Sequence, residues 1–347
     1  MNNLTTLAWP VKEIWGLPLP TASPPSPFET EWLTSMYHYF LQGQVPVTIA
    51  TVYFVSVHLC NSVVRKRQIK QAQAKDKNFV ASTKTEKELK RLPAAPFWFA
   101  KTATFKFLVL LHNIFLCVYS AWTFVGMLST IANVIHNYLP GYFNIDLSPY
   151  PKTSVFWQAI CNVEQGILTT TVPKNLSFYG FWFYMSKFYE VLDTIIILLK
   201  GKPSSLLQSY HHSGAMLCMW SGVRYQSSPI WIFVVFNSFI HTLMYLYYTL
   251  CCLHIRVPTL FKRSLTALQI FQFVFGGSLG LFHFFIQYQD LGLKDGTYIP
   301  CITSPNQAAA IFVNVSYLTP LTALFGAFYI ESYLTRQKPV VKTKKTN

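Results

Sequence analysis

Histidines recur at helical spacing inside two apolar stretches of this chain. His211 and His212 lie in residues 205–223, and His241 lies in residues 229–251. A neutral imidazole can attack a thioester or act as a general base. Nearby amide and hydroxyl groups would donate hydrogen bonds to a developing oxyanion or enolate, and the candidates are Asn237, Tyr245 and Gln269. These residue types predict acyl-transfer chemistry, with His211 as the nucleophile that forms an acyl-imidazole.

The other two histidines are expected to assist that step. We expect His241 to oppose His211 across the site and His212 to support it. One helix face carries Asn237, His241, Tyr245 and Tyr248 at i, i+4, i+8 and i+11. A lone histidine in a membrane span often only bridges two helices. Several helices with such polar faces favour a site instead.

Charged residues mark another apolar stretch, residues 178–199. Its Lys187, Glu190 and Asp193 are spaced by three and lie within an arc of roughly 120° on one side of a helix. Ionisable groups inside a membrane span are costly and are functional candidates by default. A purely structural interpretation stays open, because Lys187 and Glu190 are one turn apart and can pair.

These polar residues share one depth. At the helical rise, Asp193 and His211 lie roughly 10 Å and 13 Å from the predicted cytosolic boundary. The predicted substrate-binding residues of this layer are Lys187, Glu190, Asp193, Gln208, Asn237, Tyr245, Tyr248, Thr266, Gln269 and Gln272. A pocket of this kind, with an apolar remainder toward the lumen, suits a ligand that has a polar head and a long acyl tail.

A catalytic metal is a competing interpretation. Three histidines and a water form a known zinc pattern, and His211, His212 and His241 share the layer. Adjacent histidines on a helix point about 100° apart, which makes joint ligation awkward. We therefore predict no metal ligands and no cofactor.

The composition requires a bilayer around these elements. Of the 347 residues, 52% are hydrophobic and only 12% are charged, whereas soluble domains are typically about 25% charged. The net charge of +15 comes from Lys and Arg that collect in loops between apolar runs. That distribution follows the positive-inside rule and argues against nucleic-acid binding.

The fold predicted from this pattern is an all-α polytopic membrane protein. A span needs about 20 mostly apolar residues, and seven stretches qualify: 40–63, 108–134, 178–199, 205–223, 229–251, 265–287 and 307–331. We predict a lumenal segment over 1–35, a seven-span catalytic domain over 36–335 and a cytosolic basic tail over 336–347. The catalytic domain includes a cytosolic basic loop, residues 65–106.

Basic residues also predict the orientation. Placing 65–106, 200–204, 252–264 and the tail in the cytosol assigns 22 Lys and Arg to that side and five to the lumen. The N-terminus is then lumenal and the C-terminus cytosolic. Lys344 and Lys345 also resemble a dilysine retrieval signal of the endoplasmic reticulum, although a plain basic flank explains them equally well.

Several ordered motifs resemble those of the very-long-chain fatty-acid elongases, which are membrane 3-ketoacyl-CoA synthases. The motifs are Lys187-Phe-Tyr-Glu190-Val-Leu-Asp193-Thr194, Gln208-x-x-His211-His212, Asn237-x-x-x-His241-x-x-Met244-Tyr245-x-Tyr247-Tyr248, Thr266-x-x-Gln269-x-x-Gln272 and Leu111-His112-Asn113. The resemblance implies condensation of acyl-CoA with malonyl-CoA, with release of CO₂ and CoA. It also implies an endoplasmic-reticulum protein without a prosthetic group, in which six helices enclose an acyl-CoA tunnel and the first span lies outside.

The same resemblance carries further expectations. Family members staple two lumenal loops, which here contain Cys161 and Cys301. The expected partners are the reductases and dehydratase of the elongation cycle, membrane lipid and a second copy of the chain in a homodimer. One departure is Gln208, where the family usually has His. Glutamine cannot accept a proton, so we expect no general base at position 208. Some family members that have Gln at this position act on polyunsaturated acyl chains, which hints at the substrate class.

Two questions stay open at this level. A seven-span transporter or receptor that binds a lipid or small molecule without chemistry would also need a polar layer. If the tunnel exists, side chains beyond Gln272 in the sixth span should limit acyl length. Phe275, Leu279 and Phe282, followed by His283, can share one helix face.

Overall fold

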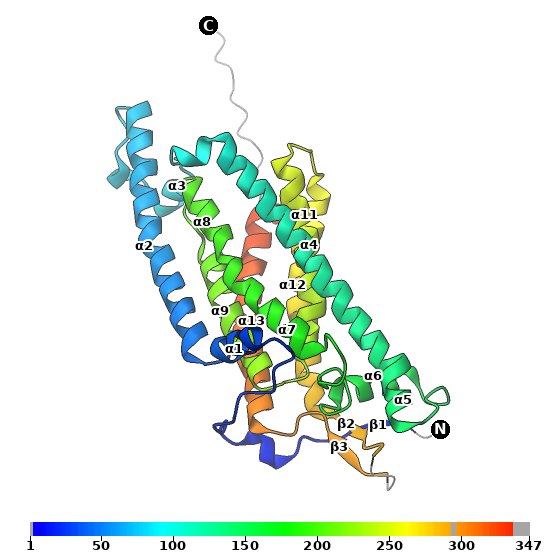
Figure 1. The fold of residues 1–347 in the computed structure, drawn as a ribbon. Helices are drawn as coiled ribbons and strands as arrows, with labels where there is room; N and C mark the ends of the chain where they lie inside the picture. Colours follow the sequence, from blue (N-terminus) through cyan, green and yellow to red (C-terminus); the bar gives the residue numbers. More distant parts are fainter. Residues whose placement is uncertain (1–2, 293–295, 336–347) are drawn as a thin grey trace.

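Long helices lie side by side in a bundle, in a computed structural model that describes residues 3–292 and 296–335 (Figure 1). Five of them are long and apolar enough to cross a membrane: α2 (Gln44–Lys75), α4 with its continuation (Ala103–Phe143), α10 to α11 (Ile230–Cys252), α12 to η6 (Thr259–Phe285) and α13 to η7 (Pro305–Leu334). They correspond to five of the seven predicted spans. The chain is therefore a multi-pass membrane protein.

The other two predicted spans are present as shorter or more polar helices. Residues 178–199 form two helices, α7 (Leu176–Tyr189) and α8 (Val191–Leu199), which meet at Glu190. Residues 205–223 form α9 (Leu206–Arg224), which packs against α2, α7 and α13. Because α9 carries Gln208 and two histidines, it does not reach the hydropathy of the other five. The count of seven spans thus remains a prediction.

Remaining short elements connect these helices. They are α1 (Glu31–Phe40), α3 (Glu86–Lys90), α5 (Leu139–Phe143), α6 (Lys152–Cys161), the helical turns η1 (Lys12–Trp15), η2 (Ala81–Thr83), η3 (Phe99–Lys101) and η6 (His283–Phe285), and the π-helical segments η4 (Val134–Tyr138), η5 (Phe233–Asn237) and η7 (Ile330–Leu334). The long spans contain the helices α4 (Ala103–Asn133), α10 (Ile230–Ile232), α11 (Ser238–Cys252), α12 (Thr259–Phe282) and α13 (Pro305–Tyr329).

A small sheet corrects the all-α prediction. Strand β1 (Thr5–Leu7) pairs antiparallel with β2 (Ile286–Gln289), which pairs antiparallel with β3 (Tyr298–Pro300). Each strand has only three or four residues, too few for an alternating pattern to be detected in the sequence. The first strand also comes from the opposite end of the chain, so only tertiary contact could reveal it.

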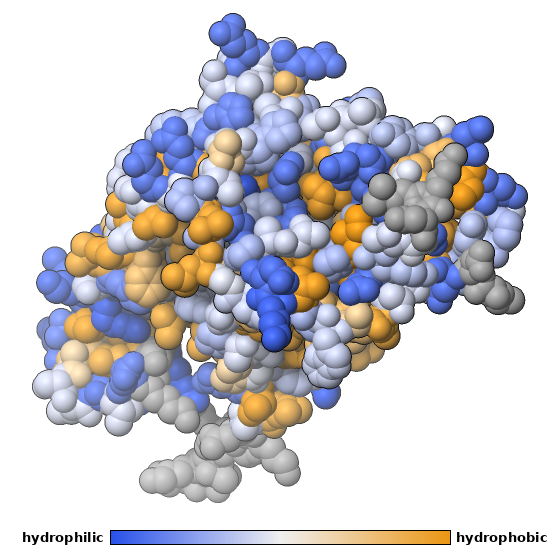
Figure 2. All heavy atoms as spheres, turned by 90° about the horizontal axis from the view of Figure 1, so that it is seen from below, coloured by the Kyte–Doolittle hydropathy of each residue, from blue (hydrophilic) through white to orange (hydrophobic). Residues whose placement is uncertain are grey.

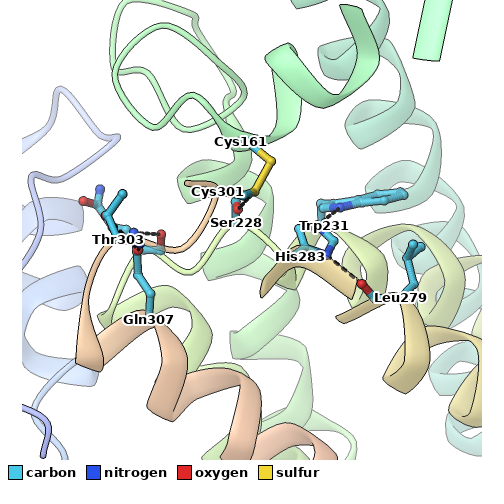
Figure 3. The surroundings of a disulfide bond; sticks show 9 residues. Cys161, Ser228, Trp231, Leu279, His283, Cys301, Thr303 and Gln307 are labelled. Atoms are coloured by element: carbon cyan, nitrogen blue, oxygen red, sulfur yellow. Dashed lines mark hydrogen bonds between the residues drawn. A yellow bond between two sulfur atoms is a disulfide. The ribbon is translucent and has the colours of Figure 1, made fainter. Parts of the chain in front are cut away.

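We call the end of the bundle that holds this sheet and α6 the disulfide end. There Cys161 of α6 and Cys301 after β3 form a disulfide with a Cα–Cα distance of 4.7 Å (Figure 3). Beside it, Trp231 Nε1 donates to His283 Nε2 over 3.3 Å, and His283 Nδ1 lies 2.7 Å from the carbonyl oxygen of Leu279 (Figure 3). His283 is therefore a fully bonded core residue. Hydrophilic and hydrophobic residues alternate over the surface of this end (Figure 2).

The opposite end, which we call the basic end, contains residues 65–106, 200–204 and 252–264. The first eleven residues of the predicted loop 65–106 continue α2 as helix to Lys75. Further on, the loop docks on the bundle: Ala95 N–H donates to the Gly201 carbonyl over 3.0 Å, and Phe97 N–H donates to Leu199 over 3.1 Å. Gly201 has φ +70°, and a Cβ there would lie 2.1 Å from Ala95, so only glycine allows this approach.

Candidate active site

Glu190 occupies the junction between α7 and α8 and is the centre of the site. Its carboxylate is buried, with 2% of the residue exposed. Lys187 Nζ donates to Oε1 over 2.7 Å, and Ser186 Oγ donates to the same oxygen over 3.1 Å. Buried charges are tolerated when paired and hydrogen-bonded. The ion pair expected from the spacing of Lys187 and Glu190 is thus present.

Two histidines converge on this carboxylate. His241 Nδ1 lies 3.6 Å from Oε1 of Glu190, and His212 Nδ1 lies 4.0 Å from Oε2. On its other side, His212 Nε2 is 2.8 Å from Gln208 Nε2. Tyr53 of α2 presents its ring edge-on to His212 at a centroid distance of 6.2 Å. The imidazole of His212 is thus hydrogen-bonded through Nε2 and packed against Tyr53, while its Nδ1 makes no hydrogen bond within the described part of the chain.

A local irregularity positions Asn237 and His241. Asn237 ends the π-helical segment η5, and α11 starts at the next residue. Such π-bulges occur frequently at functional sites. Lys187 Nζ donates to Asn237 Oδ1 over 3.2 Å. One turn further, His241 faces His211, with 6.3 Å between the ring centroids. The structure thus brings together the two histidines that the sequence proposes as the reacting pair.

The partner of His211 is a residue that the sequence analysis missed. Tyr317 of α13 places its hydroxyl oxygen 2.8 Å from His211 Nδ1. In the sequence, Tyr317 has one polar neighbour a helical turn away, Asn314, and the sequence analysis did not single out this pair. Its proximity to His211 depends on the packing of α13 against α9.

A second polar cluster surrounds Asp193. Tyr245 donates its hydroxyl to Asp193 Oδ2 over 2.6 Å, and His112 Nε2 lies 2.8 Å from Oδ1. The His112 ring stacks on Tyr189 at 5.4 Å. In the next residue position, Thr194 shares a 2.8 Å hydrogen bond with Tyr53. The sequence analysis placed His112 in a family motif but gave it no part in the site.

Three of the predicted binding residues lie at the edge of the site. Thr266 Oγ1 donates to the Lys262 carbonyl over 3.1 Å, and Gln269 Nε2 contacts Met244 Sδ at 3.7 Å. Tyr248 is 39% exposed and packs edge-on against the Tyr245 ring at a centroid distance of 6.0 Å. These three border the histidine layer on the side of the basic end, whereas Gln272, one turn further along α12, lines the central cavity.

That cavity lies beside His211 and has a volume of about 40 Å³. Its polar lining consists of Lys187, His211, Asn237, Gln272 and Tyr317, and most of the remaining lining is aromatic or aliphatic. A second, smaller cavity of about 20 Å³ lies toward the disulfide end. Phe233, Gly276 and Leu318 line both cavities. The two cavities are therefore neighbours, and the second lies between the first and the disulfide end.

The face of α12 that borders these cavities differs from the face expected to limit acyl length. Phe275 and Phe282 are 40% and 38% exposed and point away from the cavities, while Leu279 packs into the core. The part of α12 that lines the second cavity consists instead of Gly276, Gly277 and Gly280. One residue step rotates a helix by about 100°, so a face of large side chains can adjoin a face of glycines.

Metal ligation deserves a geometric test at this site. The ligand atoms of Glu190, His211 and His241 all lie within 4.8 Å of one another, a spacing compatible with one ion. Lys187 Nζ already supplies a positive charge at Glu190 Oε1. An ion there would have to compete with this ammonium group at close range, which disfavours metal binding.

Comparison with known proteins agrees with these motifs. A sequence model of the GNS1/SUR4 (ELO) family matches residues 38–341. The chain is 30% identical to "Fatty acid elongase 2" of Trypanosoma brucei brucei over 48% of this chain and 60% of that protein. It is also 30% identical to "Fatty acid elongase A" of Dictyostelium discoideum, over 68% and 74% of the two chains.

A nematode protein extends this set. "Long chain fatty acid elongase 1" of Caenorhabditis elegans is 30% identical over 63% of this chain and 75% of that protein. No solved structure matches the chain. The family model covers most of the sequence, including every motif of the histidine layer. The chain therefore belongs to the GNS1/SUR4 (ELO) family, a family of membrane-spanning fatty acid elongases.

Proposed function

We propose that the protein is a 3-ketoacyl-CoA synthase that condenses a long-chain acyl-CoA with malonyl-CoA. The observation that carries this proposal is the placement of His211 and His241, 6.3 Å apart, at the head of an apolar cavity. A thioester bound between them would have its acyl chain in an apolar environment and its reacting carbonyl beside an imidazole. No metal or prosthetic group takes part in the proposed chemistry.

The reaction proceeds in two halves. Nε2 of His211 attacks the thioester carbonyl, the C–S bond breaks, and CoA leaves as a thiolate, which yields an acyl-histidine. Malonyl-CoA then loses CO₂, and the electron pair of the broken C–C bond forms an enolate. The enolate carbon attacks the acyl carbon, and the C–N electron pair returns to Nε2. The CoA thiolate takes up one proton from solvent.

The polar residues around the histidines suit the charges that develop. Lys187 and Asn237 line the cavity beside His211 and are placed to hydrogen-bond the oxyanion of the first half-reaction. His241 faces His211 and is placed to hydrogen-bond the enolate oxygen. Glu190 holds Lys187 by a hydrogen bond and lies 3.6 Å from His241 Nδ1, near enough to orient that ring electrostatically.

The two cavities form the proposed acyl channel. The chain of the substrate runs from His211 past Phe233 and Leu318 into the second cavity, in the direction of the disulfide end. Disulfides persist in oxidising compartments, and Lys and Arg collect on the cytosolic side. Both arguments support an orientation in which the disulfide end faces the lumen of the endoplasmic reticulum and the basic end faces the cytosol. Reductases and a dehydratase would act next on the 3-ketoacyl-CoA product.

The test is condensation by the purified protein in lipid nanodiscs. Long-chain acyl-CoA and malonyl-CoA labelled in its free carboxyl group should release labelled CO₂ together with a 3-ketoacyl-CoA identified by mass spectrometry. His211→Ala should abolish both, whereas His136→Ala, at an exposed position of η4, should leave both unchanged. Binding of acyl-CoA without CO₂ release would instead favour the transporter or receptor interpretation. A series over chain length and unsaturation would then define the preferred substrate.

A further inference from the structure

The hydroxyl group of Tyr317 contacts two atoms of His211 at once. Its oxygen lies 2.8 Å from Nδ1 of the imidazole and 2.9 Å from the backbone carbonyl oxygen of the same residue. Both residues line the central cavity. This double contact places the Tyr317 hydroxyl behind the imidazole, on the side of the ring opposite Nε2.

The number of protons available determines the direction of each of these two hydrogen bonds. A carbonyl oxygen can only accept, and a tyrosine hydroxyl has a single proton. If that proton pointed to Nδ1, the hydroxyl and carbonyl oxygens would face each other at 2.9 Å with no proton between them. The hydroxyl therefore donates to the His211 carbonyl and accepts from Nδ1–H. In a neutral imidazole, the lone pair is then on Nε2.

The surrounding residues are shaped to hold this ring. Tyr317 stacks on Tyr210 with 5.5 Å between centroids and an angle of 25° between the rings. The Tyr210 hydroxyl donates to the Tyr317 carbonyl over 3.2 Å. At Gly214, one turn after His211, a Cβ atom would lie 2.3 Å from the Tyr317 ring. A glycine at this position is thus a requirement for the close approach of α13 to α9.

We propose that Tyr317 is a positioning residue that holds His211 in its Nδ1–H tautomer and so directs the Nε2 lone pair to the acyl thioester. The inference rests on the proposed function for its catalytic consequence, but the tautomer itself is independent of the reaction. The opposite tautomer would have a proton on Nε2 and could not attack. A group that orients a catalytic histidine in this way contributes through the fraction of enzyme that is ready to react.

The first measurement is the tautomer. Protein labelled with ¹⁵N-histidine should show the Nε2 of His211 at the chemical shift of an unprotonated nitrogen, with His211→Ala used to assign the signal. In Tyr317→Phe the same nitrogen should move toward a mixture of tautomers. A protonated Nε2 in the wild type, or an unchanged signal in Tyr317→Phe, would overturn the proposal whatever the activity of the protein.

The second measurement is the rate of the first half-reaction. With acyl-CoA alone, the enzyme should release one equivalent of CoA as the acyl-histidine forms. Tyr317→Phe keeps the stacked ring and should slow this burst roughly 100-fold, less than the about 10⁴-fold loss known for a charged orienting group, with KM for acyl-CoA unchanged. Gly214→Ala should slow the burst similarly by displacing the ring. Tyr142→Phe, which removes the hydroxyl of an exposed tyrosine on α5, should stay near the wild-type rate.

The outcomes distinguish the positioning role of Tyr317 from the condensing activity of the protein. A wild-type burst rate in Tyr317→Phe contradicts the positioning role, while the condensing activity of the wild type would stand. Absence of any burst and of any CO₂ release in the wild type contradicts the proposed function, and the nitrogen signals still decide the tautomer. If Tyr317→Phe raised the KM for acyl-CoA and left the burst rate unchanged, Tyr317 would be a substrate-binding residue. That result would also overturn the proposal.

Discussion

Lys187 and Glu190 form a buried ion pair in which Nζ lies 2.7 Å from Oε1, with side chains 3% and 2% exposed. Removal of one partner from such a pair typically costs about 3–5 kcal/mol, because the remaining charge is buried without compensation. Lys187→Met should therefore lower the free energy of unfolding by an amount in that range. Thermal unfolding in detergent, compared with the wild type, measures the loss.

The double variant Lys187→Met/Glu190→Gln distinguishes a structural pair from a functional one. It should regain much of the stability, since no isolated charge remains. It should not regain condensing activity, because Glu190 also contacts His241 and His212. Full recovery of activity would show that the pair only locks the helices together.

Tyr245 and Tyr248 offer a matched comparison on one helix. The Tyr245 hydroxyl is 2.6 Å from Asp193 and the residue is fully buried, whereas Tyr248 is 39% exposed. A hydrogen bond to a charged group is worth about 1.5–3 kcal/mol. Tyr245→Phe should cost an amount of that order in unfolding free energy and reduce turnover. Tyr248→Phe should change neither, and equal effects of the two variants would refute the assignment.

Gly280 should control the length of the product. It lines the second cavity, and a Cβ at this position would meet no atom within 4 Å, so a larger side chain would project into free space. We expect Gly280→Leu to shorten the main product by one elongation step or more while condensation of shorter substrates continues. Gly326→Leu on α13, where a Cβ also meets nothing within 4 Å, is the control. Mass spectrometry of the products decides.

The large residues of α12 supply the converse test. Phe275→Ala and Phe282→Ala should leave the product profile unchanged, because both side chains point away from the cavities. Longer products from either variant would show that these large side chains limit the acyl length, as the sequence analysis expects.

The disulfide should stabilise the fold substantially. Cys161 and Cys301 are separated by 140 positions, and removal of a native disulfide typically costs about 2–5 kcal/mol. Cys161→Ser should lower the unfolding temperature, and a reducing agent should do the same to the wild type but not to the variant. Cys60→Ser, at an exposed free cysteine, should have no effect. Similar unfolding temperatures for all three proteins would argue against a stabilising bridge.

Chelators should leave the activity intact. Although Glu190, His211 and His241 have the spacing of a metal site, the proposed chemistry uses only protein groups. Dialysis against EDTA and then phenanthroline should retain the wild-type rate of CO₂ release. A loss that added Zn²⁺ restores would show that a metal ion takes part in the reaction.

Local sequence patterns were sufficient to predict the membrane class and the main polar residues of the site. Hydrophobic runs and polar stripes at helical spacing are local properties, so they can be detected without any tertiary contact. Five predicted spans match long apolar helices. The layer of Glu190, His211, His212 and His241 is likewise assembled from positions that the sequence had singled out.

Other features of the site depend on how distant segments pack together. The contact between His211 and Tyr317 joins residues 106 positions apart, and β1 pairs with a strand near residue 287. The side of α12 that borders the cavities also follows from its packing against α10 and α13. Each of these features depends on the approach of distant segments, and no local pattern encodes which distant side chain will fill the space beside a given residue.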